Sequence, residues 1–476
     1  MLERSIPTPS VVAASAAVAA AAALLLGGCM SFIPAYERPA APVAAAYPAE
    51  LLPAGSGAAA AADLEWQRFF IDARLKRLID VALANNRDLR VAVLNLEQYR
   101  AQYQIRRADE LPSLGAGVAA QRLANGSGGL AGSYAVGLQV SSYELDLFGR
   151  VRSLSQAALA QYLATAETRK AVQIALIASV AGAHINLLAD DELLRVTNDA
   201  LQTREESLRL TKLKFDNGAA SELDYRQAEQ LLEGARATLA QTRRQRLLDE
   251  NALVQLIGQP LPADLPAATA LANAQVEGDL PAGLPSELLA RRPDVRSAEQ
   301  QLIASNANIG AARAAFFPRI SLTANAGTAS GELGNLFKSG TFALTGTAQL
   351  LQPIFDAGRN QAMLDVARVN RDVAVAQYER AIQTAFREVS DALAGRATLG
   401  EQLRAQTAQA NAAQVSFRLA DLRYRNGAAS FLDVLDAQRN VFTAQQALVQ
   451  VQALRVQNLL TLYKALGGGW KDAAAS

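Results

Sequence analysis

Cysteine and histidine are almost absent from this sequence of 476 residues, which contains one of each, Cys29 and His184. A disulfide needs two cysteines, and a zinc site built from Cys and His needs several such side chains, so the chain forms neither by itself. One histidine also leaves little for a nucleophile–base pair, and no GxxxxGK phosphate-binding loop is present. We therefore expect neither an enzyme nor a bound metal or cofactor.

Aromatic residues and net charge are also scarce. Aromatic residues make up 6% of the chain and the formal net charge is +1, so the sequence indicates no basic surface that would attract nucleic acid. Hydrophobic residues make up 50%, with abundant Ala and many Gln, Arg, Glu and Leu. This composition is typical of long helices, and the chain is long enough for a large ordered core.

The N-terminus has the pattern of a signal peptide. Arg4 precedes an Ala-rich apolar stretch from Val11 to Leu26, and the stretch ends in LGGC. Because LGGC resembles the bacterial lipobox, we expect residues 1–28 to be removed and Cys29 to carry covalent lipid. An ordinary signal peptide with an incidental Cys and, less favoured, a permanent membrane span are the alternatives.

Residues 29–62 are expected to tether the lipid to the structured chain. The segment is rich in proline and ends in a Gly-Ser-Gly and Ala run, a composition typical of a linker. Met30 follows the lipobox Cys, at a position where Asp would have indicated retention in the inner membrane. The outer membrane is therefore the favoured location.

An internal duplication organises the rest of the chain. Short motifs recur in the same order and at a nearly constant spacing: Asp88-Leu89-Arg90 with Asp294-Val295-Arg296, Pro112 with Pro318, Gly149-Arg150 with Gly358-Arg359, Gly218 with Gly427, and Gly258 with Gly467. The predicted organisation is a first repeat over 63–258, a linker over 259–285, a second repeat over 286–467 and a tail over 468–476.

Within each copy the sequence period changes from helical to alternating. Residues 88–110 and 294–316 have the helical pattern, and after Pro112 and Pro318 the period becomes two, which predicts two strands per copy. The apolar positions of these strands are Leu114, Ala116, Val118 and Ala120; Tyr134, Val136, Leu138 and Val140; Ile320, Leu322, Ala324 and Ala326; and Phe342, Leu344, Gly346, Ala348 and Leu350. Each run has about the ten residues of a tilted transmembrane strand. Residues 124–133 are expected to form a loop.

The pattern then returns to helix in both copies. Residues 149–215 and 358–425 contain no Pro and almost no Gly, and each is long enough for about 100 Å of helix. Helices of this length have no small core to bury themselves in, so they must pack along other long helices. His184 lies in one of them, in an apolar run, and is expected to be a packed or hydrogen-bonded residue without a functional role.

Each long helix ends at an Asn-Gly pair, which predicts a tight turn because Gly permits positive φ. Ser221 and Ser430 follow as candidate N-caps of returning helices. Each copy therefore contains a helix, two strands and a long helical hairpin. Four strands cannot close a barrel, and open sheet edges cannot face lipid. If the strands span a membrane, several chains must share one barrel.

These segments resemble the TolC-like outer membrane factor family, in particular its lipoprotein branch in resistance-nodulation-division (RND) efflux systems. The resemblance covers nearly the whole mature chain, through YERPAAPVAAAYP (36–48), SYELDLFGRVRS (142–153), RRPDVRSAEQQLIASNANIGAARAAFFPRISLT (291–323), PIFDAGR (353–359) and YRNGAASFLDVLDAQ (424–438). It implies a mainly α fold with a trimeric twelve-stranded transmembrane β-barrel, to which each chain gives four strands. A periplasmic barrel of α-helices would continue it.

The resemblance also implies a function. The homotrimer would be a lipid-anchored channel of the outer membrane, extending into the periplasm and passively conducting drugs or other small toxic compounds. A periplasmic adaptor protein and an inner-membrane RND transporter would be its partners. Two alternatives remain: an outer membrane channel for type I protein secretion, and a non-conducting coiled-coil scaffold, against which four strands of membrane length argue.

Particular residues match the functional positions of that family. Asp433 and Asp436 match constriction acids; their i, i+3 spacing puts both on one helix face, so a trimer would present a cation-favouring ring. Asp224 and Tyr424 match positions that link neighbouring tips in the closed state, although Ala429 stands where the family often has Arg. The residues that match adaptor-contact turns are Gly218, Ala219, Ala220, Ser221, Gly427, Ala428, Ala429 and Ser430. The alternatives are ordinary turn residues and a solvated acidic helix start.

Overall fold

The computed structural model describes residues 31–48, 50, 64–124, 130–274 and 291–470. The predicted signal peptide and Cys29 lie outside these residues, as do parts of the predicted tether, linker and tail. The first half of the chain contains α2 (Trp66–Phe69), α3 (Ala73–Asn85), α4 (Arg87–Ala108), β1 (Leu114–Ala124), β2 (Leu130–Leu145), α5 (Arg150–Asp216), α6 (Glu222–Ile257) and the 3-10 helix η3 (Leu271–Asn273). The second contains α8 (Pro293–Ala314), β3 (Arg319–Ser330), the 3-10 helix η4 (Leu333–Asn335), β4 (Phe342–Leu351), α9 (Arg359–Arg425) and α10 (Phe431–Ala465).

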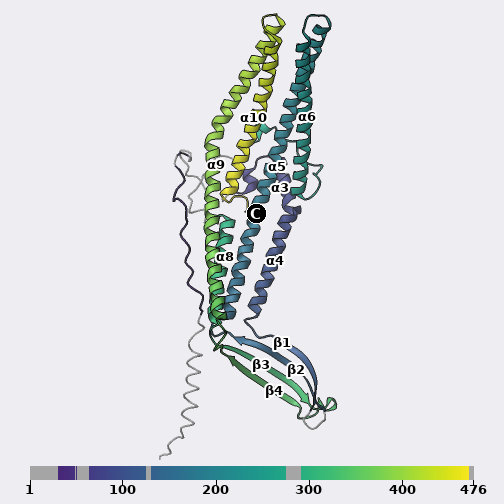
Figure 1. Ribbon diagram of the computed structural model, residues 1–476. Helices are drawn as coiled ribbons and strands as arrows, with labels where there is room; N and C mark the ends of the chain where they lie inside the picture. Colours follow the sequence, from purple (N-terminus) through teal and green to yellow (C-terminus); the bar gives the residue numbers. More distant parts are fainter. Residues whose placement is uncertain (1–30, 49, 51–63, 125–129, 275–290, 471–476) are drawn as a thin grey trace, which may run out of the picture. The chain divides into compact units, whose positions relative to one another are not determined.

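The duplication read from the sequence is visible in this order of elements. In each half a 22-residue helix precedes two strands, and a 67-residue helix follows them. The returning helices α6 and α10 have 36 and 35 residues. Figure 1 shows α5 with α6, and α9 with α10, as two helical hairpins. The predicted helix bounds agree with the observed ones to within about two residues.

The chain divides into two compact units, which are described one at a time. The first contains the strands, with residues 96–165 and 298–378 and the N-terminal segment up to Ala40. The second contains α3, α6 and α10 with the remaining parts of α5 and α9.

The strands of the first unit form one antiparallel sheet in the order β1-β2-β3-β4, so that β2 and β3 join the two copies (Figure 1). The pairing between neighbouring strands brings the predicted apolar positions into rows across the sheet: Ala116 pairs with Leu138, Leu138 with Ala326, and Ala326 with Leu344. The next row is Gly117, Gly137, Gly327 and Ala343. One face therefore carries Leu and Val, and the other carries small and polar residues.

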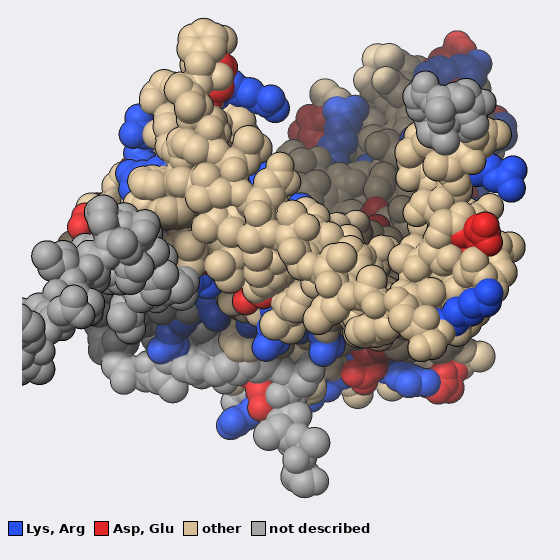
Figure 2. All heavy atoms as spheres, turned by 90° about the horizontal axis from the view of Figure 1, so that it is seen from below, with Lys and Arg blue, Asp and Glu red and all other residues tan. Residues whose placement is uncertain are grey.

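The apolar face is open to the surroundings of the single chain. Val118 is 80% exposed and Leu344 is 73% exposed. Seen from below, the surface is dominated by uncharged residues (Figure 2). A bulge between Val140 and Tyr143, where Ser142 has a φ of 53°, shifts the register near the end of β2. An alternating pattern of this kind suits a sheet that faces lipid on one side.

The predicted loop over 124–133 is too long, because β2 begins at Leu130. Leu130 pairs with Ala124 and Gly132 pairs with Arg122. Ladder hydrogen bonds outweigh the low strand preference of glycine here. Gly132 also fits a close approach, since a Cβ at this position would lie 2.9 Å from the carbonyl oxygen of Gly331.

The core of the second unit receives large buried side chains from α2, α3 and α10, and others from α5, α6 and α9. Phe69 stacks on Tyr463 with ring centroids 4.0 Å apart, and the Tyr463 hydroxyl donates to the Leu64 carbonyl at 2.6 Å. Among the described residues, only α5 is long and apolar enough to cross a membrane, and half of its apolar window is buried within the chain. Residues such as Ile177 and Val180 supply this buried part.

His184 has the structural role expected from the sequence. It is buried on α5, and its Nε2 lies 3.3 Å from Oδ2 of Asp72. Asp72 is also the N-cap of α3, where it accepts from the amides of Arg74 and Leu75. Burial by itself would raise the pKa of Asp72, but the hydrogen bonds from His184 and from these amides outweigh burial and lower it to about 2.

Candidate functional site: the tips of the helical hairpins

Each helical hairpin turns at a glycine with left-handed backbone geometry, as the Asn-Gly pairs predict. Gly218 and Gly427 both have a φ of 72°. The amide of Ala219 donates to the Lys214 carbonyl at 2.7 Å, and the amide of Ala428 donates to the Arg423 carbonyl at 2.8 Å. These bonds close the ends of α5 and α9 in the same way. The two turns are therefore copies of one local structure.

Both returning helices begin with a reciprocal capping box. Ser221 Oγ accepts from the Asp224 amide at 3.1 Å, and Ser430 Oγ accepts from the Asp433 amide at 3.3 Å. The Asp224 carboxylate accepts from the Ser221 amide at 3.2 Å, and the Asp433 carboxylate accepts from the Ser430 amide at 3.0 Å. Both predicted N-caps are thus confirmed. The capping role of the two aspartates was not foreseen.

The two acids predicted for a constriction lie on one face near the start of α10. Asp433 and Asp436 are both exposed, and Asp436 accepts from Arg439 Nη1 at 2.8 Å. Beneath them, Phe431, Val434 and Leu435 are buried in an apolar cluster. The cluster fixes the opposite face of the helix, so the carboxylates point away from the packed interior. A ring of six carboxylates stays a prediction, because it involves other copies of the chain.

Tyr424 and Asp224 are not brought together within one chain. Tyr424 instead accepts a hydrogen bond from Lys214 Nζ at 3.1 Å, and the same ammonium lies 4.1 Å from its ring centroid. Lys214 belongs to α5 and Tyr424 to α9, so this contact joins the two hairpins. A link between Tyr424 and Asp224 of neighbouring chains stays a prediction.

Sequence reasoning missed Lys214. The available signal was that a basic residue precedes the aromatic residue in both copies, as Lys214-Phe215 and Arg423-Tyr424. The structure uses them differently, since Arg423 donates to the Ala428 carbonyl of its own turn at 3.2 Å. Arg425, the last residue of α9, pairs with Asp421 at 2.8 Å.

The turn residues predicted to contact an adaptor are accessible in the single chain. Six of them are exposed, and Ala220 and Ala429 are half-buried. Beside the tips, a groove of about 660 Å³ between α5, α9 and α10 is lined by Leu210, Phe417 and Tyr424, among others. Small residues on the turns and a groove of mixed polar and apolar side chains are features that another helix can approach closely.

Glu144 and Asp146 have structural roles at the strand-to-helix joint. The Glu144 carboxylate accepts two hydrogen bonds from Arg150, at 2.7 and 2.6 Å. The Asp146 carboxylate accepts from the Arg152 amide at 2.9 Å, at the first turn of α5. In the described parts of the chain, no group of His, Cys, Asp and Glu side chains is arranged to hold a metal ion.

Comparison with known proteins identifies the family. The family model described as "Outer membrane efflux protein" matches residues 78–259 and 284–468. The chain belongs to the outer membrane efflux protein family. Its two matches cover most of the chain, one in each half.

Relatives in this family are transport proteins of the outer membrane. The toluene efflux pump outer membrane protein TtgC of Pseudomonas putida is 49% identical over 456 residues, which are 94% of each chain. The outer membrane protein OprJ of Pseudomonas aeruginosa is 45% identical over 460 residues, again 94% of each chain. The open state of the Neisseria gonorrhoeae MtrE outer membrane channel is 44% identical, has a TM-score of 0.86, and is matched over 93% of this chain and 99% of that one. This chain, as a member of the family, is accordingly an outer membrane channel of an efflux pump and not an enzyme.

Proposed function

We propose that three copies of this chain form the outer membrane channel of a tripartite RND-type pump. The observation that carries the proposal is the sheet with two open edges. Within the described sheet, β1 and β4 each have a partner on one side only. Unpaired amide and carbonyl groups cannot face hydrocarbon, so membrane insertion requires that β1 of one copy pair with β4 of the next. Three copies give a closed barrel of twelve strands.

The lipid anchor of Cys29 is part of the proposal. The first described residues lie beside the ends of the strands, since Phe32 stacks on Phe317 at 4.6 Å and Phe317 stacks on Phe148 at 4.9 Å. Phe148 follows β2 and Phe317 precedes β3. The segment is held further by Asn306, which donates to the Pro34 carbonyl at 2.8 Å. Lipid on a residue so close in sequence to Phe32 would enter the membrane next to the barrel.

A passive channel needs an energy source, and we assign that role to an inner-membrane RND transporter coupled through a periplasmic adaptor. The exposed turns and the groove beside them support the adaptor contact.

The relative TtgC is named as a toluene efflux protein. We propose small toxic compounds of this kind, including drugs, as the cargo. In the trimer, Asp433 and Asp436 would form the constriction, with Asp224 and Tyr424 in the closing contacts.

Imaging of the detergent-extracted protein tests the proposal directly. Single particles should be three-fold tubes with a helical section of roughly 100 Å. Intact-mass measurement of the same sample should show covalent lipid, and Cys29→Ser should remove it while leaving the tubes intact. Monomers, or thin solid rods without a barrel, would favour the scaffold alternative and overturn the channel.

A further inference from the structure

Arg204 is a buried cation that has no acidic partner among the described residues. It lies on α5 in the second unit and is 5% exposed. Its Nη1 donates a hydrogen bond to the Leu231 carbonyl on α6 at 3.1 Å, and its guanidinium lies 4.9 Å from the Phe442 ring centroid on α10. Burial lowers the pKa of Arg204, and the charge of Arg439 lowers it further. A buried charge of this kind is unfavourable until an anion compensates it.

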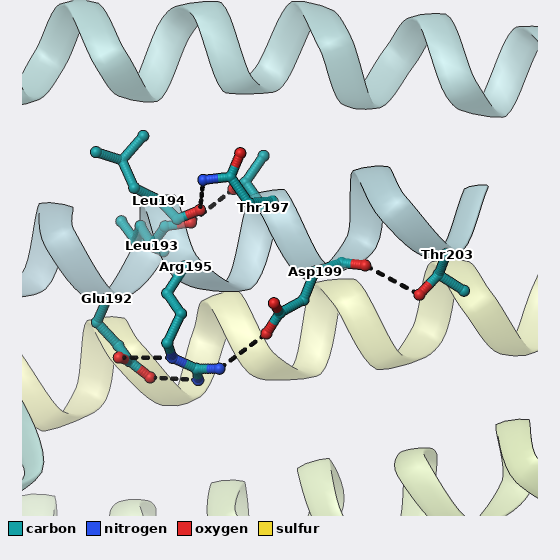
Figure 3. A network of polar contacts seen from close by, with 8 residues as sticks. Glu192, Leu193, Leu194, Arg195, Thr197, Asp199 and Thr203 are labelled. Carbon is teal, nitrogen blue, oxygen red and sulfur yellow. Dashed lines mark hydrogen bonds and ion pairs between the residues drawn. The ribbon is translucent and has the colours of Figure 1, made fainter. Parts of the chain in front are cut away.

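The acid on the rim of this site is already engaged. Figure 3 shows Asp199 bound by Arg195, with Glu192 on the other side of the same guanidinium. The distance between Arg195 Nη1 and Asp199 Oδ2 is 2.8 Å. Thr203 donates to the Asp199 backbone carbonyl at 2.9 Å, which adds to the order of this turn of α5. Asp199 therefore pairs with Arg195 and does not compensate the charge of Arg204.

A second polar side chain near Arg204 also lacks a partner. Gln438 on α10 is 8% exposed, and its Oε1 is buried without a hydrogen bond among the described residues. Arg204 and Gln438 line the same cavity of about 170 Å³. Phe417 of α9 and Phe442 of α10 supply apolar walls. A buried cation, an unpaired amide and aromatic walls around one cavity are features of a ligand site.

We propose that this cavity binds a small monocarboxylate with an apolar body. The carboxylate accepts hydrogen bonds from the free N–H groups of Arg204, in a charge-assisted contact. The Gln438 side chain lines the same cavity, and its amide is the second polar group available to the anion. The apolar body packs against Phe417 and Phe442. All these walls come from one chain, so a single copy forms the complete site.

Binding at this site would connect the two hairpins. Arg204 belongs to the α5–α6 hairpin, whereas Gln438, Phe417 and Phe442 belong to the α9–α10 hairpin. A bound carboxylate therefore contacts both, and it neutralises the charge at the point where they pack. Occupancy should stabilise this unit against thermal unfolding. This role is separate from conduction, so it does not depend on the proposed channel.

The test uses 4-fluorobenzoate and the purified full chain in detergent, observed by ¹⁹F NMR and by thermal unfolding. We expect saturable binding and a higher Tm with this probe. The neutral analogue 4-fluorobenzamide should bind at least about tenfold more weakly, because it lacks the charge. Arg204→Met should lose the preference for the anion. Gln438→Met should weaken binding while keeping that preference, and it serves if Arg204→Met fails to fold.

Arg209→Gln is the matched control. Arg209 is an exposed arginine on the same helix, where its partner is Glu206 at 2.6 Å. Its replacement should leave binding of 4-fluorobenzoate unchanged. The proposal is overturned if the wild-type protein does not bind the probe, which would mean that water or another chain fills the cavity. It is equally overturned if acid and amide bind alike, or if Arg204→Met binds as the wild type does.

Discussion

A pair of carboxyl groups between α5 and α6 should make the stability of the helical hairpin depend on pH. Asp190 is 6% exposed, and its Oδ2 is buried without a donor among the described residues. The carboxyl of Asp249 lies against it. The nearby cation, Arg246, is taken by Asp191 at 2.6 Å and by Glu250 at 2.7 Å. Burial, followed by the contact with Asp249, raises the pKa of Asp190 to about 7.

The sign of the pH dependence follows from the raised pKa. An unfolded Asp titrates near pH 3.9, so between about pH 4 and pH 7 the folded chain holds a proton that the unfolded chain has lost. Stability is therefore greatest at low pH with respect to this group, falls as pH rises through that window, and is constant above it. For a pKa raised from its ordinary value to about 7, the loss of stability is at most about 4 kcal/mol, and relaxation of the hairpin reduces this figure.

Asp190→Asn removes the charge but keeps the shape. We expect this variant to be more stable than the wild type at pH 8, by about 1–3 kcal/mol, and similar to it at pH 4. Hydrogen exchange of the α5 and α6 amides at both pH values measures the difference without requiring reversible unfolding. Asp216→Asn, an exposed substitution on the same helix, is the control. If Asp190→Asn keeps the wild-type pH dependence, or is less stable at pH 8, the reasoning is refuted.

Three further predictions concern the tips. Lys214→Met should release Tyr424 and loosen the contact between the hairpins, which would appear as higher leak conductance in lipid bilayers. Unchanged leak conductance would contradict the view that this contact holds the channel closed. Replacing Asp433 and Asp436 with Asn should reduce the cation preference of the same channels, and unchanged selectivity would exclude the acidic ring. Gly427→Ala should lower the stability of the turn by about 1 kcal/mol, because its φ of 72° is unfavourable for alanine. No steric clash adds to this loss, since no neighbouring atom lies within 4 Å of the added Cβ. Faster hydrogen exchange at that turn, with the rest of the chain unchanged, is the expected result.

Local features of the fold were predictable from the sequence because they depend on neighbouring residues. The change from helical to alternating period located the helices and strands. The Asn-Gly pairs set the turns through the φ that glycine allows, and Ser221 and Ser430 set the caps. The duplication gave the order of elements in each half. The start of β2 was misjudged because its glycines suggested a loop, whereas pairing with β1 decides the strand.

Contacts between distant residues were decided only by the tertiary structure. Three contacts join segments far apart in the chain: β2 pairs with β3, Asp190 approaches Asp249, and Lys214 contacts Tyr424. The isolation of Arg204 likewise depends on which side chains surround it in space. Periodicity tells which face of a helix is buried, but the partner depends on how the helices cross and which rotamers fit. The sequence by itself therefore determined the elements and their repetition. Packing determined which charges meet and which stay unpaired, because a charge is compensated only by groups a few ångströms away in space.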